Sequence, residues 1–375
     1  MYPSKYRKNI EKLLNFAEIE INGSNPWDIT VHNENMYERV LAHGSLGLGE
    51  SYMDGWWDCE RLDQFIYRVL SARLDKKIRK NFQFFFEYCI ARMFNRQAGA
   101  RTFAVGKHHY DIGNDLFTMM LDKYMCYSCA YWKKETETID QAQKNKMELI
   151  CRKIDLRPGM DVLDIGCGWG GFARYAAEKY QARVTGITVS QQQVNLGRHF
   201  CKGLDVDIRL MDYKKLKGQF DRVVSIGMFE HVGYKNHRKY MKAVERVLKD
   251  DGLFLLHTIG NDISAVCGDA WINRYIFPNG MTPSMSQIAK SAENLFVMED
   301  WENIGVHYDE TLMRWYKRIQ ISWRTLMKNY DDRFHRMWSY YLLSCAGLFR
   351  ARQAQVWQMV FSKKGVPGGY KPIRI

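Results

Sequence analysis

The chain has 375 residues, of which 46% are hydrophobic and 14% aromatic, enough for a real core in two or three domain-sized units or in one elaborated α/β domain with an extension. Nine cysteines at irregular spacing argue against a disulfide scaffold and favour a reduced, intracellular protein. The N-terminus does not resemble a signal peptide, and no run of about 18 apolar residues occurs, so we expect neither a leader nor a membrane span. The net charge of +13 predicts attraction to a polyanion, either nucleic acid or an anionic bilayer.

A basic amphipathic helix is predicted over residues 62–82. Its apolar face carries, at helical spacing, Leu62, Phe65, Ile66, Val69, Leu70, Leu74 and Ile78. Its other face carries Arg68, Arg73, Lys76, Lys77, Arg79 and Lys80, and a phenylalanine cluster follows at residues 82–86. Such a helix fits docking onto anionic lipid, and it fits equally an ordinary packed helix with a solvated charged face. Residues 95–101 have the composition of a linker.

From about residue 140 the pattern alternates between strands and helices. Strands are predicted at residues 161–165, 182–188, 206–211, 220–226 and 252–258, with helical runs between them. Helices at 309–328 and 332–350 then precede a last strand at 356–362. This alternation predicts an α/β fold built on a doubly wound, mostly parallel sheet.

The most informative segment joins the first of these strands to a helix. It reads VLDIGCGWGG over residues 162–171, with Gly166, Gly168 and Gly171 in the G-x-G-x-x-G spacing of nucleotide-binding turns. A dinucleotide site would need an acidic residue at the end of the next strand, which instead ends at Thr188. The segment at 220–231 resembles the fourth-strand region of class I S-adenosylmethionine-dependent methyltransferases, and we prefer that class to a dehydrogenase.

The resemblance to this class implies a Rossmann-like sheet of seven strands, mostly parallel with the last strand antiparallel, beside a smaller helix-containing N-terminal domain. It also implies that the glycine loop holds the methionine end of S-adenosylmethionine, and that residues after the second and third strands face its ribose and adenine. The cofactor-binding residues expected on this basis are Asp164, Gly166, Gly168, Gly170, Thr188, Val189, Gln193, Asp212 and Tyr213.

Four further motifs narrow the resemblance. They are HHYDIGND at 108–115, YSCAYW at 127–132, MFEHVG at 228–233 and YIFPNG at 275–280. Together they resemble the cyclopropane-fatty-acyl-phospholipid synthases, relatives of the mycolic acid methyltransferases, and the likeness covers nearly the whole chain. The family places the residues that match Tyr127 and Ser128 against the methionine portion of the cofactor, and Tyr110 is a weaker candidate in the stretch that covers it.

The family's reaction implies three needs. A cis double bond of a phospholipid acyl chain attacks the sulfonium methyl group, a carbocation forms, and loss of a proton closes the ring. The hydrocarbon needs a dry tunnel, for which the aromatic and methionine-rich candidates are residues 119–121, Trp271, 275–277, Trp315 and Tyr316, although any one of them could simply be core. The cation needs aromatic faces, for which Tyr308 and Tyr316 are candidates.

The proton needs a base, and the family holds a bicarbonate ion for this purpose. The motif positions imply that the ion is bound by Cys129, Glu230, His257, the Ile259 backbone and Tyr308. The chemistry is consistent, because Glu230 can accept from the hydroxyl of the ion while the other polar groups donate to its oxygens. An acid that orients the ion leaves a free oxygen to face the proton.

Several of these residues also have ordinary explanations. His257 ends a buried strand and could be a satisfied core histidine, although strand ends carry the site in this fold. Cys126 and Cys129 have the spacing of a zinc or redox pair, but no second ligand pair matches them, and we expect no metal. Cys345 is expected to be a structural thiol, because the reaction needs no covalent enzyme intermediate.

We therefore expect an N-terminal lipid-docking or dimerisation domain at residues 1–95, a linker at 96–105, and a catalytic domain with an acyl-chain pocket at 106–375. The expected partners are an unsaturated phospholipid acyl chain, an anionic bilayer surface and a second copy of the chain, with no nucleic acid. The expected location is the cytoplasm, at the inner face of the cell membrane. The alternatives are an enzyme of the same fold that makes methyl-branched or hydroxylated chains, a nucleic-acid methyltransferase suggested by the positive charge, and a non-catalytic lipid-binding protein.

Overall fold

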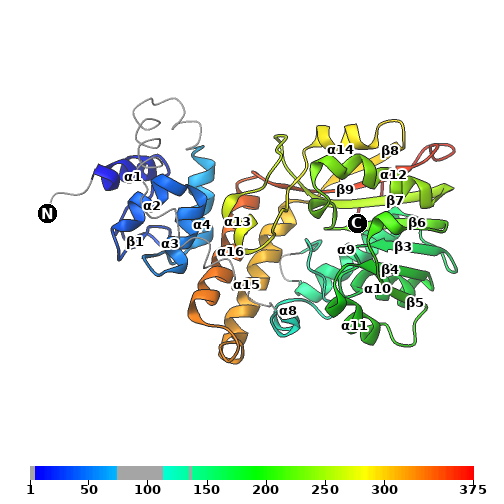
Figure 1. Cartoon of the computed structure of the whole chain (residues 1–375), viewed down its shortest axis with the longest axis horizontal. Coiled ribbons are helices and arrows are strands. Elements are labelled where there is room, and N and C mark those ends of the chain that lie inside the picture. The colour runs from blue at the N-terminus through cyan, green and yellow to red at the C-terminus, as the bar shows by residue number, and fades with distance from the viewer. Residues whose placement is uncertain (1–4, 74–112, 135–136) are drawn as a thin grey trace. The chain divides into compact units, whose positions relative to one another are not determined.

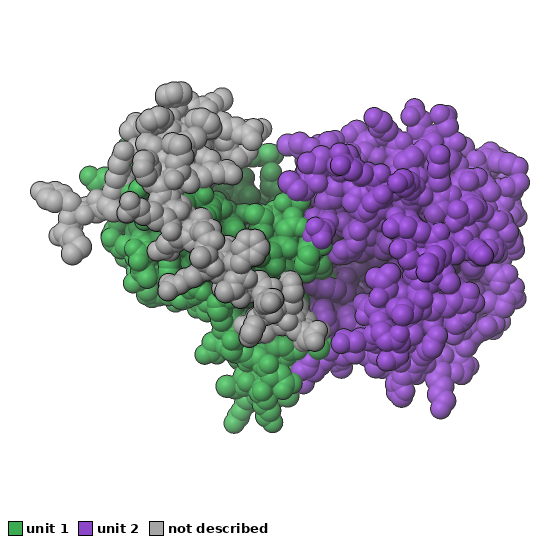
Figure 2. Space-filling model, in the orientation of Figure 1, with its two compact units in different colours: residues 1–113, 268–278, 315–353 green, residues 114–267, 279–314, 354–375 purple. Residues whose placement is uncertain are grey.

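The computed structural model describes residues 5–73, 113–134 and 137–375, and its contacts divide the chain into two compact units (Figure 2). Unit 1 comprises residues 1–113, 268–278 and 315–353. Unit 2 comprises residues 114–267, 279–314 and 354–375. The predicted linker lies outside the described residues. The N-terminal region groups with two segments from the second half of the chain, which a division by sequence order does not anticipate.

Unit 2 is built on the sheet that the sequence predicts (Figure 1). Its seven strands are β3 (Asp161–Ile165), β4 (Arg183–Thr188), β5 (Val206–Leu210), β6 (Phe220–Ile226), β7 (Leu248–Gly260), β8 (Val297–Asn303) and β9 (Gln355–Ser362). They lie in the order β5-β4-β3-β6-β7-β9-β8. The pairs from β5 to β7 are parallel, and β9 runs antiparallel to both of its neighbours. The predicted sheet with an antiparallel last strand is confirmed, whereas β8 was not recognised in the sequence.

Helices cover both faces of this sheet because its central strands are apolar on both sides. One face packs against α9 (Ile139–Lys153) and α10 (Gly171–Tyr180), and α11 (Gln191–Phe200) continues that layer over β5. The other face packs against α12 (His237–Val247) and α14 (Met285–Ala292). Alternation along β3 sends Val162 to the α9 face and Leu163 to the α12 face. Asp164 therefore lies on the α9 face.

Unit 1 is largely helical. Its elements are α1 (Lys5–Asn15), α2 (Asn35–His43), α3 (Ser45–Met53), α4 (Leu62–Ser71), α13 (Ala270–Tyr275), α16 (Asp332–Arg350) and a small antiparallel pair, β1 (Thr30–Val31) with β2 (Trp57–Asp58). Helix α8 (Asn114–Met120) belongs to unit 2, and α15 (Val306–Leu326) is divided between the units after residue 314. Within the described ranges, no helix combines the length and apolar character needed to cross a membrane.

The helix predicted over residues 62–82 is described as far as α4. Leu62, Phe65 and Ile66 are buried, and α4 packs against α16 at Gly347, where a Cβ atom would lie 2.6 Å from the carbonyl oxygen of Asp63. Arg350 also donates to the Asp63 carboxylate at 2.7 Å. This part of the helix thus follows the packed-helix alternative, and Lys76, Lys77 and Lys80 lie outside the described residues.

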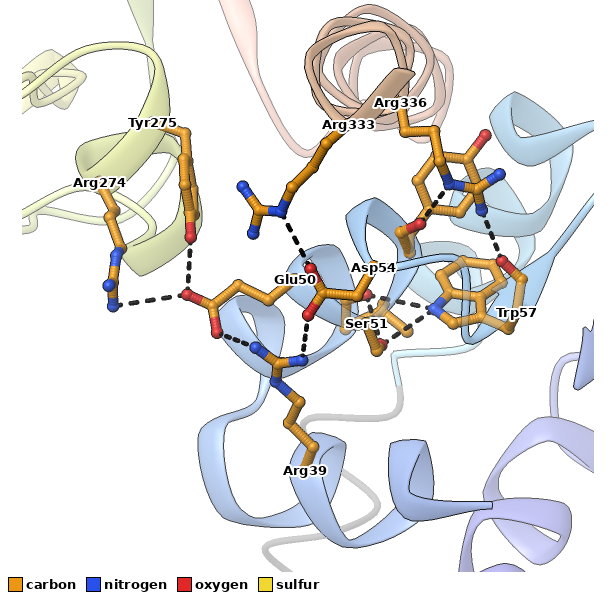
Figure 3. A network of polar contacts seen from close by, with 11 residues as sticks. Arg39, Glu50, Ser51, Asp54, Trp57, Arg274, Tyr275, Arg333 and Arg336 are labelled. Atoms are coloured by element: carbon orange, nitrogen blue, oxygen red, sulfur yellow. Dashed lines mark hydrogen bonds and ion pairs between the residues drawn. The ribbon is translucent and has the colours of Figure 1, made fainter. Parts of the chain in front are cut away.

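A polar network joins the segments of unit 1 (Figure 3). The Glu50 carboxylate accepts from Arg39 at 2.7 Å and from the Tyr275 hydroxyl at 2.8 Å. Asp54 accepts from Arg39 at 2.7 Å and from Arg333 at 3.0 Å. The network ties α2 and α3 to α13 and α16, segments that are more than 200 residues apart in the sequence.

Candidate active site

The glycine loop leaves β3 at the point where the strand order reverses, between β4 on one side and β6 on the other. Ligands in open α/β sheets bind at such a switch point, outside the carboxyl ends of the strands. Gly166 has φ +79°, and a Cβ atom there would lie 2.6 Å from the Cβ of Met228. A side chain at Gly166 would therefore clash with the loop that follows β6, so glycine is required for the close approach of the two loops.

Asp164 lies one residue before the end of β3 and is 1% exposed. Its Oδ1 atom has no hydrogen-bond partner among the described residues. Burial raises the pKa of this carboxyl to about 7, and the positive charge of Lys146 opposes the rise. A buried acceptor without a partner at the carboxyl end of a central strand fits a cationic group of a ligand.

Ser128 is held beside the loop after β6. Its Oγ accepts from the Lys146 ammonium at 2.7 Å, and its carbonyl accepts from Gln143 Nε2 at 2.9 Å. A Cβ atom on Gly227 would lie 3.8 Å from the Cβ of Ser128. The neighbouring Tyr127 ring packs edge-on against Phe117, with ring centroids 5.2 Å apart. The structure thus brings the Tyr127–Ser128 segment and the strand ends of the predicted cofactor site together.

The residues after β4 and β5 differ in their surroundings. Thr188 donates to Gln193 Oε1 at 2.6 Å, which couples the end of β4 to α11, and Val189 between them is exposed. Asp212 caps the short helix η1 (Tyr213–Lys215) by accepting from the Lys214 N–H at 2.9 Å. The Tyr213 ring packs into the core against Tyr240, with ring centroids 5.0 Å apart.

Glu230 lies in the short helix η2 (Phe229–His231), which follows β6. Its Oε1 accepts from the Ile259 N–H at 2.6 Å, and its Oε2 is buried and has no hydrogen-bond partner among the described residues. Burial raises the pKa of this carboxyl, and the Ile259 N–H acts against the rise. The sequence predicts Glu230 and Ile259 at one site, and the structure brings them together. The Ile259 N–H, which was expected to bind the ion, donates to Glu230 instead.

His257 lies on β7, on the same face as Asp164, and is 2% exposed. Its Nδ1 faces the amide nitrogen of Gln358 on β9 at 3.3 Å. Burial lowers the pKa of this imidazole well below its usual range, with a further contribution from the positive charges of Lys146 and Lys153. The ring is therefore neutral, and with the Gln358 amide assigned in this orientation Nδ1 accepts and Nε2 carries the proton.

Cys129 lies against the segment that leads into α15. Its Sγ lies 3.9 Å from the carbonyl oxygen of Ile304, and the next backbone N–H, of Ala130, donates to Thr311 Oγ1 at 3.2 Å. Tyr308, 7% exposed, lies on the first turn of α15. The N–H of Ile304 donates in turn to Val356, which pairs with Ile259 across β7 and β9. One continuous set of contacts thus links Cys129, the Tyr308 turn, Ile259 and Glu230.

Among the described residues, Cys126 and Cys129 do not form a reactive or metal-binding pair. Burial raises the pKa of Cys129 well above its usual range, and Cys126 contacts a different partner, Met147, at 3.9 Å. In the described parts of the chain, no group of three or more histidine, cysteine or acidic residues could hold a metal ion. Burial also raises the pKa of Cys345 to about 12, so this thiol in unit 1 is a poor nucleophile, consistent with a structural role.

The aromatic candidates are divided between the units. Tyr308 belongs to unit 2, whereas Trp271, Tyr275 and Tyr316 belong to unit 1. Trp271 is fully buried, and the Tyr275 hydroxyl is bound to Glu50. In unit 1, these two rings pack against each other with centroids 5.5 Å apart.

Comparison with known proteins places this site in a family. Residues 97–359 match the family model for mycolic acid cyclopropane synthetase. The chain belongs to this family. A cyclopropane-fatty-acyl-phospholipid synthase of Escherichia coli strain K12 is 54% identical over 363 residues, covering 97% of this chain and 94% of the relative. The resemblance read from the motifs is confirmed.

Solved structures agree in fold. The cyclopropane synthase MmaA2 from Mycobacterium tuberculosis is 31% identical with a TM-score of 0.64, covering 68% of this chain and 96% of that one. The mycolic acid cyclopropane synthase CmaA1, solved in complex with SAH and CTAB, is 31% identical with a TM-score of 0.64, covering 70% and 98%. The chain is accordingly an S-adenosylmethionine-dependent methyltransferase of class I fold that transfers a methylene group to unsaturated lipids, and it is not a dehydrogenase.

Proposed function

We propose that the chain forms cyclopropane rings on phospholipid acyl chains drawn from an anionic membrane surface, with a bicarbonate ion as the base. The observation that carries the base assignment is Glu230, whose buried Oε2 has no partner while its Oε1 accepts from the Ile259 N–H. A buried carboxylate oxygen without a donor calls for a ligand that brings a hydroxyl group. Bicarbonate is an anion with one such group.

S-adenosylmethionine fits the other end of the site. Asp164 would accept from the ammonium of its methionine portion, and Ser128 would contact the same portion from the loop after α8. The glycines at 166, 168 and 170 all have positive φ and let backbone approach the ligand closely. Thr188, Val189, Gln193, Asp212 and Tyr213 would border the ribose and adenine. When bound, the cofactor supplies an electrophilic methyl group on a sulfonium centre.

The protein's own groups then have defined tasks. One bond forms between the methyl carbon and an alkene carbon as the sulfur–carbon bond breaks, and the acyl chain becomes a carbocation. Aromatic faces such as that of Tyr308 stabilise this charge without offering a nucleophile. Glu230 orients the base by accepting from its hydroxyl, while neutral His257 and the Cys129 thiol offer donors. The transferred carbon loses one proton, and its electron pair closes the ring.

A direct assay tests this function. The purified chain is incubated with methyl-labelled S-adenosylmethionine and vesicles of a monounsaturated phospholipid, and the acyl chains are analysed by mass spectrometry. We expect one added methylene per converted chain without a change in the number of rings plus double bonds. Removal of dissolved carbon dioxide from the buffer should slow the reaction, and added bicarbonate should restore it. A methyl-branched or hydroxylated product would instead identify the alternative enzyme of the same fold.

We also propose that the enzyme works as a homodimer at the inner face of the membrane. The net charge of +13 supports electrostatic attraction to anionic lipid, and a basic run follows α4 in the sequence. Replacing Arg73, Lys76, Lys77 and Lys80 by glutamine should weaken binding to anionic vesicles by about tenfold or more, because each surface cation contributes roughly 1 kcal/mol. Wild-type binding should also weaken as salt is raised.

The matched control neutralises four exposed lysines of unit 2, Lys202, Lys215, Lys217 and Lys242, and so changes the net charge by the same amount. Vesicle co-sedimentation should show little change for the control. Equal weakening of both variants would mean that general charge, rather than the segment after α4, attracts the enzyme. Undiminished binding of the first variant would disprove the docking assignment.

A further inference from the structure

Helix α9 carries a buried lysine at the edge of the candidate site. Lys146 is 1% exposed and lies on the same helix face as Gln143 and Ile150, both fully buried. A lysine side chain is rarely buried to this extent unless its charge is compensated. Its position on the apolar stripe of α9 therefore calls for an explanation that packing alone does not give.

The ammonium of Lys146 has a polar partner but no anionic one. Its Nζ donates to Ser128 Oγ at 2.7 Å, and among the described residues no carboxylate oxygen lies within 4.0 Å of it. Lys153, two turns later on α9 and also fully buried, shows the usual solution, because its Nζ lies 2.5 Å from Glu302 and 3.7 Å from Asp300. The comparison singles out Lys146 as a buried cation that still lacks a close counter-ion.

The hydrogen bond to Ser128 has a directional consequence. An ammonium group has only donors, so Ser128 Oγ must be the acceptor in this pair. The hydroxyl proton of Ser128 is then left to be donated to another acceptor. Lys146 in this way fixes Ser128 as a donor and adds a positive charge behind it, a combination that selects an anionic group.

Asp164 supplies an acceptor for the cationic group of the same ligand. It lies on the α9 face of the sheet, its charge interacts with that of Lys146, and its Oδ1 has no partner among the described residues. A buried donor–cation pair beside the loop after β6 and a buried acceptor at the end of the adjacent strand β3 match the two charges of a zwitterion. The amino-acid end of S-adenosylmethionine is such a group.

We infer that Lys146 is a positioning residue that selects the carboxylate of the cofactor's methionine end by holding Ser128 as a hydrogen-bond donor. The inference rests on the cofactor site proposed above. A residue of α9, outside the glycine loop, would then discriminate between ligands that carry the amino-acid portion and ligands that lack it.

Two ligands separate this role from a structural one. S-adenosylhomocysteine carries the amino-acid end, whereas 5′-methylthioadenosine keeps the adenine, ribose and sulfur but lacks that end. In Lys146→Met, calorimetry should show affinity for S-adenosylhomocysteine reduced by about tenfold or more, since a charge-assisted hydrogen bond and its charge are lost. Affinity for 5′-methylthioadenosine should change by less than about twofold. The control Lys153→Met removes another buried lysine of α9 and should leave the ratio of the two affinities unchanged.

Ser128→Ala provides the second arm, because it removes both the hydroxyl proposed to donate to the carboxylate and the acceptor that the Lys146 ammonium contacts. It should weaken S-adenosylhomocysteine selectively, and the double variant Lys146→Met/Ser128→Ala should be no weaker than the worse single variant, because both changes remove one coupled unit. Equal loss of both ligands in Lys146→Met and Ser128→Ala, or additive losses for S-adenosylhomocysteine, would overturn the inference. If the wild-type chain bound neither ligand, the cofactor site itself would be wrong, a failure distinct from that of Lys146.

Discussion

Glu230→Gln should reduce ring formation by about a thousandfold while S-adenosylhomocysteine binds as tightly as in the wild type. The substitution keeps the size of the side chain, and the Gln carbonyl can still accept from the Ile259 N–H, which Glu230 Oε1 contacts at 2.6 Å. The other atom changes from an acceptor to an NH₂ donor. It then cannot accept from the hydroxyl of bicarbonate, so the ion loses the contact that orients it.

Two measurements make this result specific. Product is quantified by mass spectrometry with the enzyme saturated in both substrates, and ligand binding is measured by calorimetry on the same preparation. Removal of dissolved carbon dioxide should slow the wild type and leave the residual rate of the variant unaffected, because the variant no longer uses the ion. Full ring formation by Glu230→Gln would show that Glu230 has no part in deprotonation.

The sheet and the polar residues at its strand ends were predictable because they depend on local pattern. Glycine spacing, apolar runs and turn residues act over a few positions, and these placed Gly166, Thr188 and Glu230 at or after the ends of β3, β4 and β6, which are adjacent in the sheet. Asp212 was implied at the site by the resemblance to the methyltransferases, and its contact with the cofactor stays a prediction. That Ile259 would bind Glu230 directly depends on how the loop after β6 folds back, which no local pattern records.

Strand β8 was missed because its sequence is acidic. It includes Glu299, Asp300 and Glu302, residues that are uncommon in strands. Asp300 and Glu302 lie against the buried Lys153 of α9, and Glu299 accepts from Ser362 on β9. The charges are thus compensated by residues distant in the sequence, a tertiary effect that overrides strand propensity.

Lys146 was also missed, although the sequence holds a signal for it. Residues 143, 146, 150 and 154 repeat with the spacing of one helix face, and two of them are polar within an otherwise apolar stripe. A lysine in such a stripe points to a buried partner or ligand. The resemblance to the methyltransferases also implied Tyr213 at the cofactor site, but the packing of its ring into the core against Tyr240 was not predicted.

Asp164→Asn should make the ligand-free protein more stable at pH 8 and bind S-adenosylmethionine more weakly. Burial raises the pKa of Asp164 to about 7, against 3.8 for an unperturbed carboxyl. Between these values the folded state retains a proton that the unfolded state has lost, so stability falls as pH rises from about 4 to about 7 and then levels off. Above pH 7 the wild type carries the full cost of a buried charge, about 4 kcal/mol, which asparagine avoids.

Thermal melts of the two proteins as a function of pH, without ligand, test whether the ionised Asp164 destabilises the folded protein. The melting temperatures should coincide near pH 4 and diverge as pH rises through 7, with the asparagine variant higher. Calorimetry at pH 8 should show the reverse order for S-adenosylmethionine, because the ammonium of the methionine end loses an ionised acceptor whose Oδ1 has no other partner among the described residues. A variant that melts lower than the wild type at pH 8 would mean that the carboxylate is compensated in the ligand-free protein. Unchanged affinity would mean that the ammonium is bound elsewhere, and that the cost of burying Asp164 is unrelated to the cofactor.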